Sequence, residues 1–202
     1  MPGKIVGEHF IPLVLFAFVG SFTPGPNNLM VTASGTLFGF RRTVPHILGV
    51  LFGFSGMVVA FGLGLGQIFQ AYPIIHQWLR IAGAIYLLYL AWRIARAGDR
   101  SGGDSAQRPL TFIEAAAFQF LNPKAWTLTL GVIAAFTTPG GNVVLELAVI
   151  VAVFAVMIIG TLTVWCLFGM AIRRFLASPR ALRITNLIMA ATVALSVVML
   201  FV

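Results

Sequence analysis

The chain is poor in charged residues, and above all in acidic ones. Of its 202 residues, 9% are charged, and 5 Asp or Glu residues stand against 13 Lys or Arg. Soluble domains carry about 25% charged residues, so this composition excludes an ordinary soluble domain. The hydrophobic share of 59% excludes a disordered chain, which requires low hydrophobicity. The composition therefore indicates a membrane protein.

Cysteine and histidine are also scarce. The single cysteine, Cys166, excludes a disulfide framework. The 3 histidines lie more than 25 residues apart, and the sequence contains no paired carboxylates. Acid–base catalysis and metal catalysis need such groups close together. We therefore expect neither a metal nor a cofactor, and a membrane-embedded enzyme is a disfavoured alternative.

The apolar residues form six long segments. A membrane-spanning helix needs about 20 mostly apolar residues. The predicted spans cover residues 10–40, 44–69, 74–92, 112–136, 143–172 and 184–202. The sequence thus predicts an all-α integral membrane protein with six transmembrane helices.

One long polar stretch divides these spans into two groups of three. Residues 97–111 are rich in Gly, Asp and Ser and read as a linker on the cytoplasmic side. Because three is an odd number, the half after the linker enters the membrane with the opposite orientation. We therefore expect a single domain, 1–202, made of a three-helix repeat in 1–96 and an inverted one in 112–202.

The arginines predict the orientation. Ten of the 11 arginines follow the first, third and fifth spans, and Arg80 lies inside the third, whereas the connections near residues 70–73 and 137–142 carry no charge. The positive-inside rule places the arginine-rich side in the cytoplasm, so both termini are predicted to be periplasmic or extracellular. This distribution also accounts for the net charge of +8 without a nucleic-acid partner.

The first predicted span is interrupted near its centre. Residues 23–28 read Thr-Pro-Gly-Pro-Asn-Asn. Pro24 and Pro26 each remove a backbone donor and clash with the preceding turn, and Gly25 adds backbone freedom. We expect this helix to break at mid-membrane rather than merely to bend.

The fourth predicted span has a matching interruption, with Asn122, Pro123 and Lys124 in sequence. Lys124 lies about 18 Å along a helix from residue 112, near the membrane midplane. A charge at that depth costs at least about 2.5–3.5 kcal/mol, so Lys124 should face a polar cavity.

Interrupted helices at matching places in two inverted halves are typical of secondary transporters. A proline kink without function is the alternative for either break alone. A break also exposes a half-helix N-terminus, which attracts anions such as a substrate carboxylate. The predicted substrate-binding residues are Pro24, Gly25, Pro26, Asn27, Asn28, Gln119, Asn122, Pro123 and Lys124.

With these two motifs the chain resembles the lysine exporter (LysE/RhtB-type) family of bacterial amino-acid exporters. The resemblance rests on residues 22–28 and 118–126, and on the agreement in length and hydrophobic segments. It implies a multi-pass protein of the bacterial inner membrane that exports amino acids or related metabolites, driven by the proton motive force. It does not identify the substrate.

Few groups are candidates for proton coupling. Glu114 lies at the predicted cytoplasmic end of the fourth span, and His46 at that of the second, where histidine titrates near neutral pH. Small residues on one face of the second span permit close packing, either within the chain or in a homodimer. Export of a cation or another small solute remains an alternative, although hard cations prefer several carboxylates.

Overall fold

The computed structural model describes residues 7–65, 73–96, 108–175, 179–198 and 201, and every regular element in them is a helix. The elements are α1 (Phe10–Phe22), α2 (Pro26–Phe38), α3 (Phe40–Ala60), the π-helix η1 (Phe61–Leu65), α5 (Pro73–Arg96), α6 (Phe112–Gln119), α7 (Pro123–Phe136), α8 (Val143–Phe175) and α9 (Pro179–Leu195). The predicted all-α class is confirmed for the described residues.

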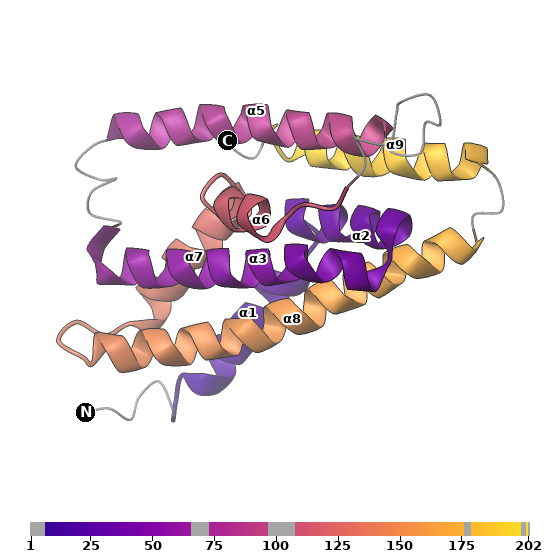
Figure 1. The fold of residues 1–202 in the computed structure, drawn as a ribbon. Coiled ribbons are helices and arrows are strands. Elements are labelled where there is room, and N and C mark those ends of the chain that lie inside the picture. Colours follow the sequence, from indigo (N-terminus) through magenta and orange to yellow (C-terminus); the bar gives the residue numbers. More distant parts are fainter. Residues whose placement is uncertain (1–6, 66–72, 97–107, 176–178, 199–200, 202) are drawn as a thin grey trace.

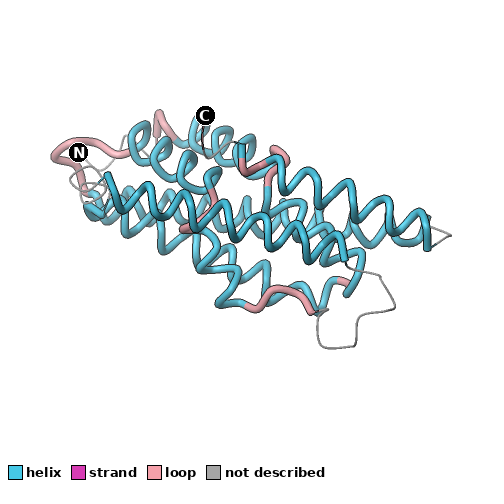
Figure 2. Tube along the Cα trace, turned by 90° about the horizontal axis from the view of Figure 1, so that it is seen from above, coloured by secondary structure: helices cyan, strands magenta, loops and turns pink. Residues whose placement is uncertain are grey.

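The two halves of the chain form one packed bundle, in which helices of each half contact helices of the other. The most extensive helix pairs are α2 with α8, α3 with α6 and α5 with α9. Each pair joins a helix from before the 97–111 stretch to one from after it. In Figure 1 the long helices α3, α5 and α8 cross the molecule, with the short helices α2 and α6 between α3 and α5. Figure 2 shows the same bundle from above.

Both predicted helix breaks are present. The first separates α1 from α2 and bends the pair by 55°. The second separates α6 from α7, which begin at Phe112 and Pro123. A proline stands at the start of α2 and of α7. Proline suits the first position of a helix because its missing N–H would have no partner there, so both prolines begin new helices.

Three described helical stretches are long and apolar enough to cross a membrane, namely Phe40–Leu65, Gln77–Arg96 and Val143–Arg174. The bent pair α1 and α2 gives a fourth if it is counted as one span. The break leaves α6 and α7 with 8 and 14 residues, and α9 has 17. These three are shorter than the roughly 20 residues of a straight span. The six-span inverted repeat therefore stays a prediction.

Several helices extend beyond the predicted spans at their arginine-rich ends. α3 begins at Phe40 instead of residue 44, so Arg41 and Arg42 lie in its first turn. α5 and α8 continue to Arg96 and Phe175, and α9 begins at Pro179, five residues early. Arginine is a good helix former whose long side chain reaches water from a helix end, so hydropathy underestimates such ends. Residues 66–69 of the second predicted span, residues 97–107 of the predicted linker and residues 199, 200 and 202 of the sixth predicted span lie outside the described residues.

Gly39 alone separates α2 from α3. Its φ of 79° lies in the left-handed region, which glycine adopts without the steric cost of a Cβ. The chain therefore reverses at one residue, which brings α3 back alongside α2.

Two glycines of the predicted small-residue face serve packing inside the chain. A Cβ built on Gly53 would lie 2.5 Å from the carbonyl oxygen of Ala116 in α6. One built on Gly49 would meet the Phe112 carbonyl more closely still. Gly56, on the same helix, has nothing within 4 Å. Small residues thus let α3 and α6 approach closely, as in other membrane helix pairs.

Candidate functional site

A pocket lies where the two helix breaks meet. The space between its lining atoms is about 460 Å³, including a part that opens outward. Of the predicted binding residues, the pocket is lined by Gly25, Asn27, Asn28, Gln119, Asn122 and Lys124. The three prolines are not among its lining residues; Pro26 and Pro123 act instead by starting the half-helices.

Asn27 and Gln119 join the two breaks. Asn27 Nδ2 donates a hydrogen bond to Gln119 Oε1 at 2.8 Å, and Gln119 Nε2 donates to Asn27 Oδ1 at 3.3 Å. Gln119 Nε2 also donates to the carbonyl of Ala115 at 2.8 Å, and the Gln119 side chain is fully buried. Buried amides need such partners, so this pair positions the start of α2 against the end of α6.

Lys124 reaches across the pocket to the other break. Its Nζ donates a hydrogen bond to the carbonyl oxygen of Thr23, at the end of α1. Asn28 Nδ2 donates to the same oxygen at 3.1 Å and to the Ser21 carbonyl at 3.0 Å. The last carbonyls of a helix lack intrahelical partners and carry the negative end of its dipole. The ammonium of Lys124 therefore neutralises the end of α1.

The two half-helix N-termini differ in their capping. At α7, Asn122 Oδ1 accepts a hydrogen bond from the backbone N–H of Lys124 at 3.2 Å. At α2, no described side chain caps the helix, and the first intrahelical bond runs from Leu29 N to the Gly25 carbonyl at 3.1 Å. Asn27 and Asn28, whose backbone N–H groups precede it, are among the residues that line the pocket. Backbone N–H groups at the start of a helix lie at the positive end of its dipole and attract anions.

The opposite wall of the pocket is apolar. It is formed by Val50, Phe54, Leu128, Phe154, Ile158 and Leu162. Among the described residues that line the pocket, Lys124 is the one charged group, and none is acidic. The pocket therefore combines one cation, several amides and an apolar wall.

The α8 residues of this wall were not predicted. Phe154, Ile158, Thr161 and Leu162 lie on one continuous apolar helix, whose sequence shows no interruption. Thr161, buried and polar, is the one signal in the sequence that could have indicated the pocket-facing side.

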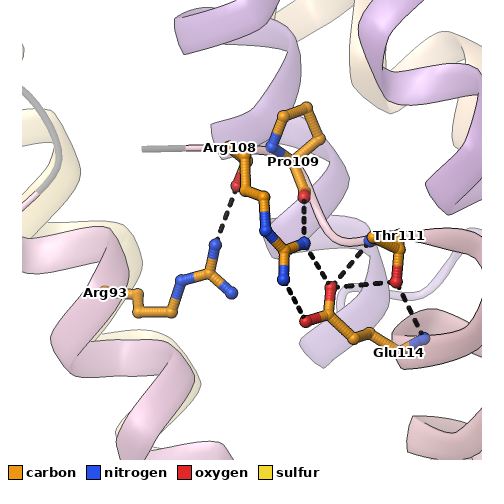
Figure 3. A network of polar contacts seen from close by, with 5 residues as sticks. All are labelled: Arg93, Arg108, Pro109, Thr111 and Glu114. Atoms are coloured by element: carbon orange, nitrogen blue, oxygen red, sulfur yellow. Dashed lines mark hydrogen bonds and ion pairs between the residues drawn. The ribbon is translucent and has the colours of Figure 1, made fainter. Parts of the chain in front are cut away.

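Glu114 lies outside this pocket, in a polar cluster at the start of α6 (Figure 3). It forms a two-fold contact with Arg108, with Nη2 to Oε1 at 2.6 Å and Nη1 to Oε2 at 2.7 Å. It also completes a capping box with Thr111. Arg93 Nη2 donates to the Arg108 carbonyl at 2.8 Å. The structure thus gives Glu114 a helix-capping role beside the predicted one in coupling, which stays a prediction.

His46, the second candidate for coupling, is buried within α3 and lines a different pocket. That pocket is described below. Its role in coupling is likewise a prediction.

Long apolar helices together with broken helices that meet at one pocket are typical of helical membrane transport proteins. The profile of the LysE type translocator matches residues 18–202. The chain belongs to this family, as the resemblance in the sequence predicts.

Two curated relatives carry a more specific description. The cysteine/O-acetylserine efflux proteins of Escherichia coli (strain K12) and Shigella flexneri are each 31% identical to this chain over 134 residues. The matched region covers 63% of this chain and 68% of each relative. No solved structure matches the chain significantly.

Proposed function

We propose that this protein is a secondary exporter that moves small amino acids out of the cytoplasm across the bacterial inner membrane. The observation that carries the proposal is the meeting of both helix breaks at one pocket, with Lys124 inside it. Irregular backbone at membrane depth is tolerated only where it lines protein or a water-filled cavity. The efflux described for the two relatives supports the same function.

The substrate carboxylate binds between the uncapped start of α2 and the ammonium of Lys124. Asn27, Asn28 and Lys124 all line the pocket, and they carry backbone N–H or ammonium donors. The amide oxygens of Gln119 and Asn122 are acceptors for the substrate ammonium.

The substrate side chain faces the apolar wall, beside Phe54 and Phe154. This arrangement suits a neutral side chain such as that of cysteine or O-acetylserine. A second ammonium, as in lysine, would find no acidic partner among the described lining residues, and an unpaired buried charge is costly.

Substrate binding also disturbs the contact between the two breaks. A carboxylate that binds Lys124 competes with the Thr23 carbonyl for the same ammonium. Release of Thr23 removes one of the two described side-chain hydrogen bonds to its carbonyl and so changes the joint between α1 and α2. Binding in the pocket is thereby linked to a movement of one half against the other, as alternating access requires.

The arrangement in the membrane follows the arginine distribution. We place the arginine-rich ends of α3, α5 and α8 in the cytoplasm and both termini outside, with six spans as two inverted repeats. Export is coupled to the proton motive force, with Glu114 and His46 as the candidate proton carriers.

The test is flux through liposomes that contain the purified protein and are loaded with radiolabelled O-acetyl-L-serine. We expect saturable counterflow, and efflux that responds to a proton gradient. Lys124→Met keeps the side-chain length and should abolish the flux. Leu130→Met, on the exposed side of α7 outside the pocket, should not change it.

Flux of equal size in Lys124→Met and in the unaltered protein would contradict the carboxylate site. Analysis of the released compound separates the alternatives: a changed product would indicate an enzyme, and flux of a metal cation alone would indicate a cation exporter.

A further inference from the structure

A second pocket lies at the arginine-rich end of the bundle, between α2, α3, α5 and residues 108–110. The space between its lining atoms is about 480 Å³, close to that of the first pocket. Its charged and polar lining residues are Ser34, His46, Arg93 and Arg108. None of the described residues that line it is acidic.

His46 indicates a polar occupant. Its side chain is 1% exposed, and neither ring nitrogen has a hydrogen-bond partner among the described residues. A neutral imidazole offers one donor and one acceptor, and leaving both unpaired in a protein interior costs free energy. His46 is among the residues that line the pocket, although both ring nitrogens are themselves covered, so a small polar molecule there would pair with the ring after a rotation of the side chain.

Arg93 supplies the positive charge of this pocket. The neighbouring Arg108 forms its ion pair with Glu114, which offsets its charge, whereas no described acidic group pairs with Arg93 (Figure 3). The Arg93 guanidinium lies 5.8 Å from the centre of the Tyr89 ring and donates from Nη2 to the Arg108 carbonyl. A guanidinium carries five N–H donors in a planar fork that matches a carboxylate.

The second pocket lies along the same helices as the first. On α2, Asn28 lines the first pocket and Ser34 the second, and six residues of helix span about 9 Å. On α3, Val50 lines the first and His46 the second, about 6 Å along the axis. The two pockets are therefore separated by one to two helical turns along the same helices.

We propose that this second pocket is a loading site for the exported solute, which binds the solute carboxylate at Arg93 and a polar group of the same molecule at His46. The ligand class is a small zwitterion with one carboxylate. This identification of the ligand rests on the proposed function, and the orientation proposed above places the site at the cytoplasmic entrance.

Protection of a single cysteine from a maleimide tests the site without measuring transport. The cysteine is placed by Leu37→Cys, at a half-buried position that lines the pocket, in a Cys166→Ala background. We expect O-acetyl-L-serine to slow its labelling several-fold. Val44→Cys, also half-buried but outside the pocket lining, is the control and should not be protected.

A pair of arginine variants separates a carboxylate site from a general change in shape. With Leu37→Cys in place, Arg93→Gln should abolish protection. Arg96→Gln, on the same helix but stacked at 4.8 Å on the Trp92 ring, should preserve it. Where Leu37→Cys does not fold, Pro109→Cys reports on the same pocket.

The outcomes for this site and for the proposed function are distinct. Protection that is absent, or that survives Arg93→Gln, overturns the loading site even if the liposomes show export. Protection that requires Arg93 supports the site even if the liposomes show no flux, in which case the proposed function fails instead. Lys124→Met should leave protection unchanged, because Lys124 lines only the first pocket.

Discussion

Asn27 and Gln119 lie 92 residues apart and exchange two hydrogen bonds, one in each direction. Asn27 follows the break between α1 and α2, and Gln119 precedes the break between α6 and α7. One amide pair therefore connects the two helix breaks. Both residues of the pair also line the pocket. The pair thereby links the stability of the fold to the shape of the binding site.

The Asn27–Gln119 pair should show energetic coupling. Asn27→Ala removes one partner of the buried Gln119 amide, and Gln119→Ala leaves the half-buried Asn27 amide without its partner, so each should lower the free energy of unfolding. The free energy of unfolding of the double variant should exceed the value expected from adding the two losses. We expect the excess to be about 0.6 kcal/mol, the average found for hydrogen bonds between membrane helices. Thermal or denaturant unfolding of the four proteins in detergent measures this. Strict additivity would mean that the two amides do not interact.

Gly25→Ala should displace Lys124 without unfolding the protein. A Cβ on Gly25 would lie 2.7 Å from Lys124 Cδ and 3.2 Å from Nζ. The Gly25 φ of −165° is extended backbone that alanine also adopts, so the conflict is with the Lys124 side chain alone. We expect the KM for O-acetyl-L-serine counterflow to rise about tenfold, which corresponds to about 1.4 kcal/mol of binding free energy.

Gly56→Ala is the matched control for this change, because nothing lies within 4 Å of the added methyl group. The two variants should unfold at similar temperatures and differ in transport. A Gly25→Ala protein with the original KM would show that the position of Lys124 does not affect substrate binding.

Glu114→Gln tests the coupling role of this residue. Glutamine also suits the capping box with Thr111, so α6 should keep its start. If Glu114 carries protons, the variant should lose most of the pH dependence of efflux and still allow downhill flux. The measurement is efflux from liposomes at a series of external pH values, with and without a proton gradient.

Arg108→Gln supplies the comparison, because it removes the ion pair but leaves the Glu114 carboxylate able to titrate. We expect this variant to remain pH-dependent. An identical pH profile in all three proteins would transfer the coupling role to His46 or to another group.

Cysteine labelling from each side of the membrane tests the orientation. Arg42→Cys, in the first turn of α3, should react only from the cytoplasm, and Gly141→Cys, between α7 and α8, only from outside. The reason is the restriction of arginines to one end of the spans. Labelling of both cysteines from the same side would rule out the six-span arrangement.

Much of this protein could be predicted from local sequence. The composition indicates a membrane protein, because a chain with this apolar share cannot cover its surface with polar groups. The breaks at Pro26 and Pro123 were also predictable, since a missing backbone donor acts on the turn in which it stands. The arginine-rich ends of α3, α5, α8 and α9 extend beyond the predicted bounds. The reason is that an arginine lowers the hydropathy of a segment but does not interrupt helical hydrogen bonding.

Only the tertiary structure decided which groups meet. The contact of Lys124 with Thr23 joins residues 101 positions apart. The pairing of Asn27 with Gln119 and the apolar wall from α8 also connect distant segments, and no local pattern encodes such distances. The same holds for His46, whose place in a separate pocket depends on how α3 packs against α2 and α5. Local backbone chemistry determined where the helices break, and the packing of the two halves decided that both breaks surround one site.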